Sequence, residues 1–300
     1  MLRINTMMRP TKTVLYEITL LLEPMYESTR HAQNVAWWFL EGVTKKSRTQ
    51  LIIEPSLSLT EAQLQQLQKW IHAHTVEQYP LQYLLGSVSF GPLEILVEAP
   101  TLIPRPETEE WCFNLLSSLA PLAHTPLRIL DMCTGSGCIA LWVAKALPSS
   151  TVYGVDISDA ALALAEKNAA HNKISNVRFF KSDLFEVLNQ NAPFDLIVSN
   201  PPYINPDVWH ELSPMVSRWE DRGALVAANQ GLEIIQSLVR MAPLYLTKYS
   251  PLTVLGFPRL MIEIGYDQGP IVQELFIDAG FGTVRVLTDS SERDRAVSGY

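Results

Sequence analysis

Short apolar runs and longer amphipathic stretches alternate regularly from residue 127 onward, and this alternation constrains the fold more than any other feature of the chain. The apolar runs are LRILDM, TVYGVDI, VRFFKSD, FDLIVSN, RLMIEI and TVRVLTD, each with the length of one buried strand. The amphipathic stretches are CIALWVAKAL, DAALALAEKNAAHN, GLEIIQSLVRMAPLYL and GPIVQELFIDAG. Alternation at this rhythm predicts an α/β fold with a doubly wound, mainly parallel sheet.

A different pattern precedes it. From about residue 13 to 75, apolar residues recur three and four apart, as in ESTRHAQNVAWWFLEGV, which is typical of amphipathic helices. We therefore expect a small helical domain over residues 1–79, with His72 and His74 facing solvent. The tryptophans of this domain are expected in its core: Trp37, Trp38 and Trp70.

Residues 80–106 change character again. The stretch YLLGSVSFGPLEILVEAPTLIPRP combines alternating apolar residues with Gly86, Gly91 and several prolines. This composition predicts a hairpin or a pair of short strands, and so a linker between the helical domain and an α/β domain over residues 107–300.

Composition excludes several classes of protein. Of the 300 residues 47% are hydrophobic and 18% charged, and the formal net charge is −8, which disfavours a broad electrostatic grip on nucleic acid. No apolar run approaches the roughly 18–20 residues needed to span a bilayer. The three cysteines, an odd and sparse set, favour a reducing compartment. Because Cys133 and Cys138 lack CxxC spacing and no histidine lies near them, we expect no metal site.

The first sixteen residues, MLRINTMMRPTKTVLY, carry Arg3, Arg9 and Lys12 and no acidic residue. That resembles a short transit peptide, but a basic N-terminus before a helix is the simpler interpretation. We therefore expect a cytoplasmic protein, with the mitochondrial matrix as the alternative.

A glycine turn follows the first predicted strand of the α/β domain. In LDMCTGSGCIA, Gly135 and Gly137 lie where a doubly wound sheet binds ligands. The spacing is not GxGxxG and no GK[ST] is present, so a phosphate cradle is disfavoured. Asp156 ends the next strand about twenty residues later, where a carboxylate accepts from ribose hydroxyls. The pattern predicts an adenosine ligand without phosphates, S-adenosylmethionine.

Each acidic residue of this pattern has a simpler interpretation as well. Asp156 precedes a helix and fits an N-cap, although Ser158 or Asp159 already fills that position. Asp183 ends the third strand, where its carboxylate would accept from the adenine amine and Leu184 would pack on the ring. The alternative for Asp183 is an ordinary acidic residue that begins a turn.

The fourth strand ends in DLIVSNPPYI, residues 195–204. Neither Pro201 nor Pro202 has an N–H for a sheet ladder, so the pair forms a stiff turn at the same edge as the glycine turn. The Asn200 side-chain oxygen and the Pro201 carbonyl can accept from the N–H groups of a planar amide or aromatic amine. Tyr203 offers that group a flat face. This set predicts methyl transfer to nitrogen by positioning and electrostatics.

Taken together, these motifs resemble the protein-(glutamine-N5) methyltransferases that modify the Gly-Gly-Gln loop of peptide-chain release factors. The resemblance covers nearly the whole chain and lies in TLIPRPETEEW, ILDMCTGSGCIA, VDIS, SDLF, DLIVSNPPYI and RDRAVSGY. It implies a Rossmann-like class I S-adenosylmethionine-dependent methyltransferase fold with a small helical N-terminal domain for substrate recognition.

The resemblance also assigns residues. The cofactor-binding set that it implies, together with the acids discussed above, is Cys133, Thr134, Gly135, Ser136, Gly137, Asp156, Asp183, Leu184 and Asn200. The substrate glutamine would be held by Asn200, Pro201, Pro202 and Tyr203. Two positions depart from the commoner pattern: Cys133 stands where Gly is frequent, and Leu184 where an aromatic residue is frequent.

Alternatives remain open at this stage. DMCTGSGCIA is also similar to enzymes that methylate a glutamine of ribosomal protein uL3, and NPPY also occurs in RNA and DNA amino-group methyltransferases. A catalytically silent cofactor-binding module is a further alternative. The expected partner is a release factor as protein substrate, with no direct nucleic-acid contact, no membrane and a monomeric enzyme. Arg105 and Glu107 fit a hinge ion pair or the site equally well, and Glu220 and Glu263 stay unassigned.

Overall fold

The computed structural model describes residues 8–189 and 193–300. The chain divides into two compact units, one ending at Gly86 and one running from Ser87 to Tyr300. The predicted linker over residues 80–106 differs from this division, because helix α5 (Leu81–Leu85) belongs to the first unit and the hairpin after it to the second. The basic N-terminal stretch lies partly outside the described residues.

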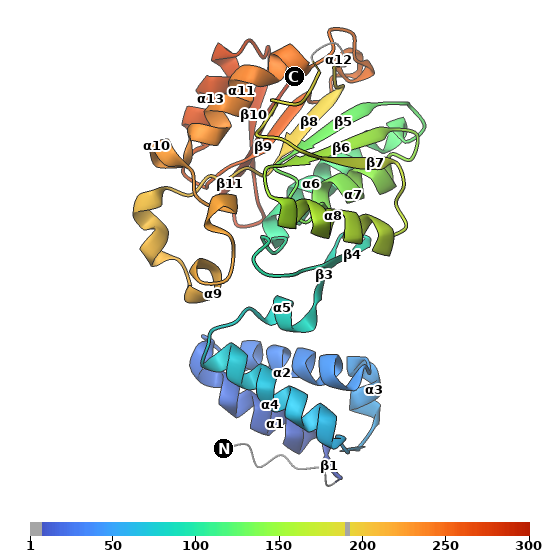
Figure 1. Ribbon diagram of the computed structural model, residues 1–300, viewed down its shortest axis with the longest axis vertical. Helices are drawn as coiled ribbons and strands as arrows, with labels where there is room; N and C mark the ends of the chain where they lie inside the picture. The colour runs from blue at the N-terminus through green and yellow to red at the C-terminus, as the bar shows by residue number, and fades with distance from the viewer. Residues whose placement is uncertain (1–7, 190–192) are drawn as a thin grey trace. The chain divides into compact units, whose positions relative to one another are not determined.

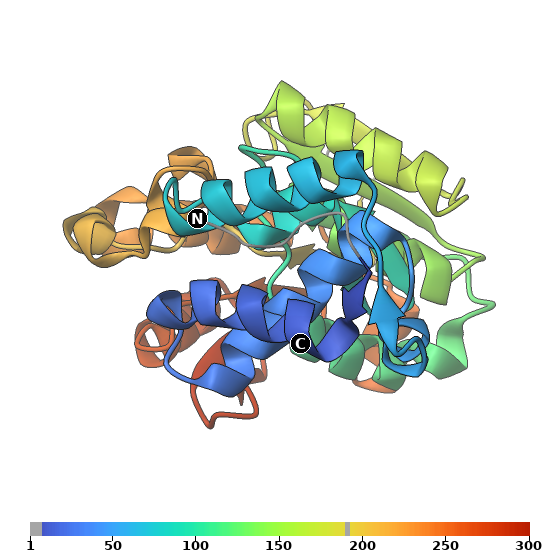
Figure 2. The ribbon, with the colours of Figure 1, turned by 90° about the horizontal axis from the view of Figure 1, so that it is seen from below.

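The first unit is a small helical bundle, as the periodicity predicts. Its helices are α1 (Thr11–Leu22), α2 (Thr29–Thr44), α3 (Arg48–Ile53) and α4 (Glu61–Thr75), followed by α5. Helices α1, α2 and α4 pack side by side (Figures 1 and 2). Their buried residues belong to one apolar core. A short antiparallel pair, β1 (Arg9–Pro10) and β2 (Ser56–Leu57), closes its edge. Ser28, Ser47 and Thr60 cap α2, α3 and α4 with their side chains.

Two expectations for this unit are wrong. Trp37 is buried, but its neighbour Trp38 is 45% exposed, because consecutive helical residues point about 100° apart. His74 is buried rather than solvent-facing: its Nδ1 lies 2.9 Å from the Tyr79 carbonyl and its Nε2 lies 2.6 Å from the Tyr26 hydroxyl. Burial lowers the pKa of His74 accordingly.

The second unit is built on a seven-stranded sheet, in the order β10-β11-β9-β8-β5-β6-β7. Its strands are β5 (Arg128–Met132), β6 (Thr151–Asp156), β7 (Val177–Lys181), β8 (Leu196–Ser199), β9 (Leu260–Glu263), β10 (Val284–Thr288) and β11 (Asp294–Gly299). Strands β5 to β9 are parallel, and β11 pairs antiparallel with both β9 and β10. The expected doubly wound α/β fold is confirmed.

Helices cover both faces of this sheet (Figure 1). Helices α6 (Pro106–Leu119), α7 (Cys138–Ala146) and α8 (Asp159–His171) lie on one face. Helices α11 (Glu233–Tyr245) and α13 (Gly269–Asp278) lie on the other, where their apolar residues form a core with β5, β8 and β9. Shorter helices of this unit are α9 (Pro214–Ser217), α10 (Ala228–Gly231) and α12 (Pro251–Leu255), and its 3-10 turns are η2 (Ala120–Leu122), η3 (Pro206–Glu211) and η4 (Arg222–Ala224). The 3-10 turn η1 (Glu23–Met25) belongs to the first unit.

The expected hairpin is present as β3 (Ser87–Phe90) and β4 (Leu93–Leu96). It is fastened to the second unit, because the Asn168 side chain of α8 exchanges two hydrogen bonds with Leu96, of 2.7 and 3.1 Å. Asn172 does the same for Glu94. The hairpin is therefore part of the α/β unit and not a free linker.

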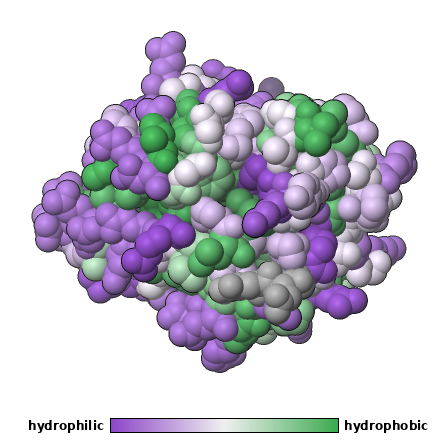
Figure 3. Space-filling view, turned by 90° about the horizontal axis from the view of Figure 1, so that it is seen from above, coloured by the Kyte–Doolittle hydropathy of each residue, from purple (hydrophilic) through white to green (hydrophobic). Residues whose placement is uncertain are grey.

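The surface in Figure 3 mixes hydrophilic side chains with small hydrophobic patches, which is usual for a folded domain. Among residues 8–189 and 193–300, no helix combines the length and apolar composition that a bilayer crossing requires. Within the same ranges, no group of three or more His, Cys, Asp and Glu side chains is arranged to hold a metal ion.

Candidate active site

A cavity of about 410 Å³ opens at the carboxyl ends of β5, β6, β7 and β8, within the size range of small-molecule sites. It brings together residues that the sequence analysis singled out one by one: Cys133, Gly135, Asp156, Asp183, Leu184, Asn200 and Pro202. Thr134, Ser136, Gly137 and Pro201 are buried and form the body of the two turns. Parallel strands end at one edge, so Met132 and Ser199 pair there although they are 67 positions apart.

The glycine turn has the left-handed backbone that its composition suggests. Gly135 has a φ of +55° and Gly137 a φ of +81°. A Cβ on Gly137 would lie 3.0 Å from the Cβ of Ala165, so the turn can pack closely on α8 only with glycine there. A Cβ on Gly135 would have no atom within 4 Å among the described residues. The glycine therefore leaves open space where a ligand can approach the backbone.

Cys133 shares this backbone conformation, with a φ of +60°. L-residues adopt it at a cost of roughly 1–2 kcal/mol, which explains why glycine suits the position. Leu184 also has a positive φ, of +46°, and is partly buried against the core below the cavity. Cys133 and Leu184, the two residues that depart from the commoner family pattern, thus both lie in the cavity wall and both have a strained backbone.

A buried carboxylate that sequence reasoning missed holds the turn from below. Asp131 Oδ2 accepts from the Thr134 hydroxyl at 2.6 Å and from the Ala140 N–H at 3.0 Å. Its Oδ1 has no hydrogen-bond partner among the described residues. Burial raises the pKa of Asp131 to about 7. The only sequence signal was its place in ILDM, where it looked like one more strand residue.

Asp156 is held by two backbone donors. Its Oδ2 accepts from the Gly135 N–H at 2.8 Å, and its Oδ1 accepts from the Ser158 N–H at 2.9 Å. The N-cap of α8 is Ser158, whose side chain accepts from the Ala161 N–H, so Asp156 is not needed for capping. Burial raises the pKa of Asp156, and these backbone N–H groups oppose the rise. Each oxygen keeps a lone pair that can accept from a ribose hydroxyl.

The Asn-Pro-Pro-Tyr turn contributes Asn200 and Pro202 to the same cavity as Asp156. The Asn200 Nδ2 donates to the Thr108 hydroxyl at 3.2 Å, so its Oδ1 is the amide atom left to accept from a ligand. Tyr203 is fixed at three points: its N–H donates to the Leu225 carbonyl, its carbonyl accepts from Gln268, and its hydroxyl donates to Glu263 at 3.1 Å. Burial raises the pKa of Tyr203.

Two loops complete the cavity wall, and only one of them lies within a motif that the sequence analysis singled out. They contribute residues 100–102, within TLIPRPETEEW, and a set between Asp221 and Ile234. The guanidinium of Arg105 binds both oxygens of Glu220, at 2.7 and 2.6 Å, and the Glu220 side chain is 1% exposed. Arg105 therefore connects the two loops instead of forming a hinge pair with the exposed Glu107.

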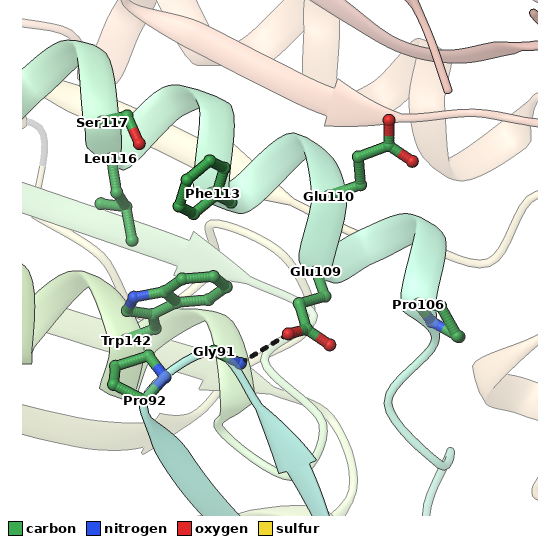
Figure 4. Close-up of a pocket in the computed structure, with 9 residues that line it drawn as sticks. All are labelled: Gly91, Pro92, Pro106, Glu109, Glu110, Phe113, Leu116, Ser117 and Trp142. Atoms are coloured by element: carbon green, nitrogen blue, oxygen red, sulfur yellow. Dashed lines mark hydrogen bonds between the residues drawn. The ribbon is translucent and has the colours of Figure 1, made fainter. Parts of the chain in front are cut away.

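A larger cavity, of about 740 Å³, lies elsewhere in this unit (Figure 4). Its wall consists of α6, α7 and the turn between β3 and β4, with Phe113 and Trp142 facing one another across it. The Glu109 carboxylate accepts from the Gly91 N–H at 2.9 Å, as the dashed line in Figure 4 shows. None of the strand-end residues described above lines this cavity, so the smaller one is the candidate active site.

The smaller cavity fits an S-adenosylmethionine molecule in two respects. The open space beside Gly135 admits a ligand against the backbone, and Asp156 presents acceptors for a ribose at the next strand end. Gly135 follows β5, where the strand order reverses between β5 and β8, and Asp156 ends the neighbouring strand β6.

Comparisons with known proteins agree with this geometry. The family described as PrmC N-terminal domain matches residues 19–86, and the family described as Methyltransferase small domain matches residues 114–213. Release factor glutamine methyltransferase of Escherichia coli is 36% identical, over 87% of this chain and 89% of the relative. The Salmonella typhimurium protein of the same name is 38% identical over the same shares.

A crystal structure of the SAM dependent methyltransferase from Agrobacterium tumefaciens shares the fold, with a TM-score of 0.50 at 15% identity, covering 71% of this chain and 68% of that one. The relatives exceed 30% identity along most of both chains, and they match the helical unit as well as the α/β unit. The chain therefore belongs to the release factor glutamine methyltransferase family, a family of S-adenosylmethionine-dependent methyltransferases.

Proposed function

We propose that this protein transfers a methyl group from S-adenosylmethionine to the side-chain nitrogen N5 of the glutamine in the Gly-Gly-Gln loop of a peptide-chain release factor. The observation that carries the proposal is the Asn200 amide, which lines the same cavity as Gly135 and Asp156 and whose Nδ2 is bound to Thr108, so that its oxygen is the atom left to accept from a substrate. The names of the relatives support a release factor as the substrate.

The difficulty of the reaction lies in the acceptor nitrogen. An amide nitrogen is a poor nucleophile, because its lone pair is delocalised into the carbonyl. The Asn200 side-chain oxygen and the Pro201 carbonyl would accept from its two N–H groups and hold the nitrogen in place for attack. When bound, S-adenosylmethionine supplies an electrophilic methyl group. The residues in the turns at Gly135 and Asp156 would bind the cofactor and fix its place relative to Asn200.

The proposed partner and compartment follow from the substrate. Release factors work on ribosomes, so we propose that the protein acts in the cytoplasm or, alternatively, in the mitochondrial matrix. The net charge of −8 favours a protein over a nucleic-acid substrate. We propose that the enzyme acts as a monomer, with the helical unit contacting the release factor.

Tandem mass spectrometry tests the proposal directly. Purified release factor is incubated with S-adenosylmethionine and wild-type protein, Asn200→Ala or Asn200→Asp. The wild type should add one methyl group to the glutamine of the Gly-Gly-Gln loop. Losing one preorganised hydrogen-bond partner costs about 10²–10³ in rate, so Asn200→Ala should add almost none. Asn200→Asp keeps the shape but adds a charge beside the Pro201 carbonyl, and should also lose most activity.

Parallel reactions separate the rival functions. The same incubation is run with ribosomal protein uL3 and with total RNA. Methylation of uL3 or of RNA in place of the release factor would overturn the proposal, as would undiminished transfer by Asn200→Ala. Tight cofactor binding without transfer to any of the three substrates would indicate a silent binding module.

A further inference from the structure

We propose that Glu263 is a positioning residue that acts through Thr108 to decide which atom of the Asn200 amide faces the methyl acceptor. The inference rests on the proposed function, because it concerns the same acceptor site. It assigns a role to Glu263 and to the PETEE segment, neither of which the sequence analysis could place.

Glu263 is buried at the end of β9 and receives hydrogen bonds from three side chains. Its Oε2 accepts from the Thr108 hydroxyl at 2.7 Å and from the Trp111 indole N–H at 2.8 Å. Its Oε1 accepts from the Tyr203 hydroxyl at 3.1 Å. Only 1% of the residue is exposed. One carboxylate thus joins the first turns of α6 to both polar side chains of the Asn-Pro-Pro-Tyr turn.

The direction of the hydrogen bonds follows from the groups present. An indole N–H can only donate, so Oε2 of Glu263 must accept. With Glu263 ionised, or protonated on Oε1 alone, the same oxygen also accepts the single proton of the Thr108 hydroxyl. Thr108 has only lone pairs left for Asn200, and only the Nδ2 of Asn200 carries protons. The chain therefore runs from Asn200 to Thr108 to Glu263, and it runs this way whether or not Oε1 carries a proton.

This direction has a chemical consequence at the cavity. With Nδ2 bound to Thr108, the Asn200 Oδ1 points to the substrate, where it accepts from an N–H of the target amide. If the amide turned over, Nδ2 would meet another NH₂ group, and two donors cannot satisfy one another. An asparagine amide without a fixed partner has little to choose between the two orientations. Glu263 removes this choice through Thr108.

The placement depends on tertiary structure alone. Thr108 lies in the first turn of α6 and is 1% exposed, while Glu263 is 155 residues further along the chain. Burial raises the pKa of Glu263, and the donors Trp111, Thr108 and Tyr203, together with the charge of Arg295, oppose the rise. Burying a carboxyl group costs free energy even when donors surround it, so packing alone does not account for a glutamate at this position.

Two substitutions at Thr108 separate the relay from packing. Thr108→Val keeps the volume and loses the hydroxyl, whereas Thr108→Ser keeps the hydroxyl and loses a methyl group. We expect Thr108→Val to lower kcat for release-factor methylation at least tenfold, with the Kd for S-adenosylmethionine within threefold of wild type. Thr108→Ser should retain most of the wild-type kcat. A purely structural role predicts the reverse order, because serine leaves the larger void.

The orientation of the amide is measured independently of any substrate. In ¹⁵N-labelled protein, the side-chain NH₂ of Asn200 is identified by its absence from the spectrum of Asn200→Asp. One of its protons should exchange slowly in wild type and in Thr108→Ser, and rapidly in Thr108→Val. If wild type methylates no release factor, the proposed function fails, but this measurement still decides whether the relay exists.

A double-mutant cycle tests whether the loss of kcat in Thr108→Val depends on Glu263. Glu263→Met removes the acceptor, and its kcat is compared in the wild-type and Thr108→Val backgrounds after thermal melting has shown the variants folded. If Glu263 acts on Asn200 through Thr108, the second change should add less than threefold to the first. Fully multiplicative effects, wild-type kcat in Thr108→Val, or equal losses in Thr108→Val and Thr108→Ser would overturn the proposal. The Thr108 pair decides it even where Glu263→Met does not fold.

Discussion

Asp156→Asn is the substitution whose effect on the cofactor site can be worked out most fully. Both carboxylate oxygens already accept from backbone N–H groups, Oδ2 from Gly135 and Oδ1 from Ser158. An asparagine has one acceptor oxygen and one NH₂ group. In either orientation its NH₂ group must face a backbone N–H, so the substitution disturbs the glycine turn as well as the ribose contact.

The size of the effect follows from the lost charge. A hydrogen bond to a charged group contributes about 1.5–3 kcal/mol, which corresponds to roughly 10- to 150-fold in affinity. The repulsion between NH₂ and the Gly135 N–H acts in the same direction, because it pushes the turn away from its bound position. We therefore expect the Kd for S-adenosylmethionine to rise by about 10- to 150-fold.

Isothermal titration calorimetry with S-adenosylmethionine and S-adenosylhomocysteine measures this change. Asp159→Asn is the matched control: it makes the same substitution three residues away, at an exposed side chain paired with Lys181 and outside the cavity wall. The control should bind as wild type does. If folded Asp156→Asn also binds with wild-type affinity, the assignment of Asp156 to the ribose is refuted.

Three further predictions concern the frame of the site. Gly231→Ala should destabilise the protein by about 2–5 kcal/mol in chemical denaturation, because its Cβ would lie 2.0 Å from the Tyr203 carbonyl oxygen at a φ of +85°; a smaller loss than 1 kcal/mol would contradict this. Burial raises the pKa of Asp131 in the folded protein to about 7, above its usual 3.8, so the free energy of unfolding of the wild type should fall as the pH rises from about 4 to about 7. Asp131→Asn lacks this fall and should gain up to about 4 kcal/mol relative to wild type across that range; parallel curves would refute the raised pKa. Glu220→Gln should cost about 1–3 kcal/mol and weaken S-adenosylmethionine binding, since it leaves the partly exposed Arg105 without its charged partner between two cavity loops; unchanged binding by calorimetry would separate that pair from the site.

The architecture of the α/β unit was largely predictable because the central parallel strands β5, β8 and β9 are buried on both faces and read as apolar runs. Strand β11 was not predicted, because the only apolar side chains in DRAVSG are those of Ala296 and Val297. This strand forms because it pairs with β9 and β10, and pairing between distant segments leaves no signal in the local sequence. Trp38 and His74 were misplaced for a related reason, because periodicity gives the existence of a helix better than the facing of each residue.

The residues of the candidate site also fall into those that the sequence could place and those that it could not. Residues at strand ends, such as Asp156 and Asn200, could be placed together from sequence because parallel strands end at one edge of the sheet. Thr108 and Glu263 could not be assigned, since their contact joins residues 155 positions apart. Asp131 has its partners Thr134 and Ala140 close by in the chain, but within ILDM it looked like one more strand residue. Burial distinguishes them: each is at most 1% exposed, and each carries a polar group that must find a partner inside the protein.

The way these buried groups are paired explains why the cavity presents acceptors. Thr108, Trp111 and Tyr203 all give their protons to Glu263, and Asn200 gives one of its own to Thr108. Donors are thus used up inside the protein, and the atom of Asn200 that remains towards the cavity is an oxygen. A substrate that brings its own NH₂ group satisfies that oxygen, whereas a substrate that brings only acceptors leaves it desolvated and unpaired. Selectivity for an amide nitrogen would then originate in the interior of the protein, and changes behind Asn200 should lower the rate of transfer more than they lower cofactor affinity.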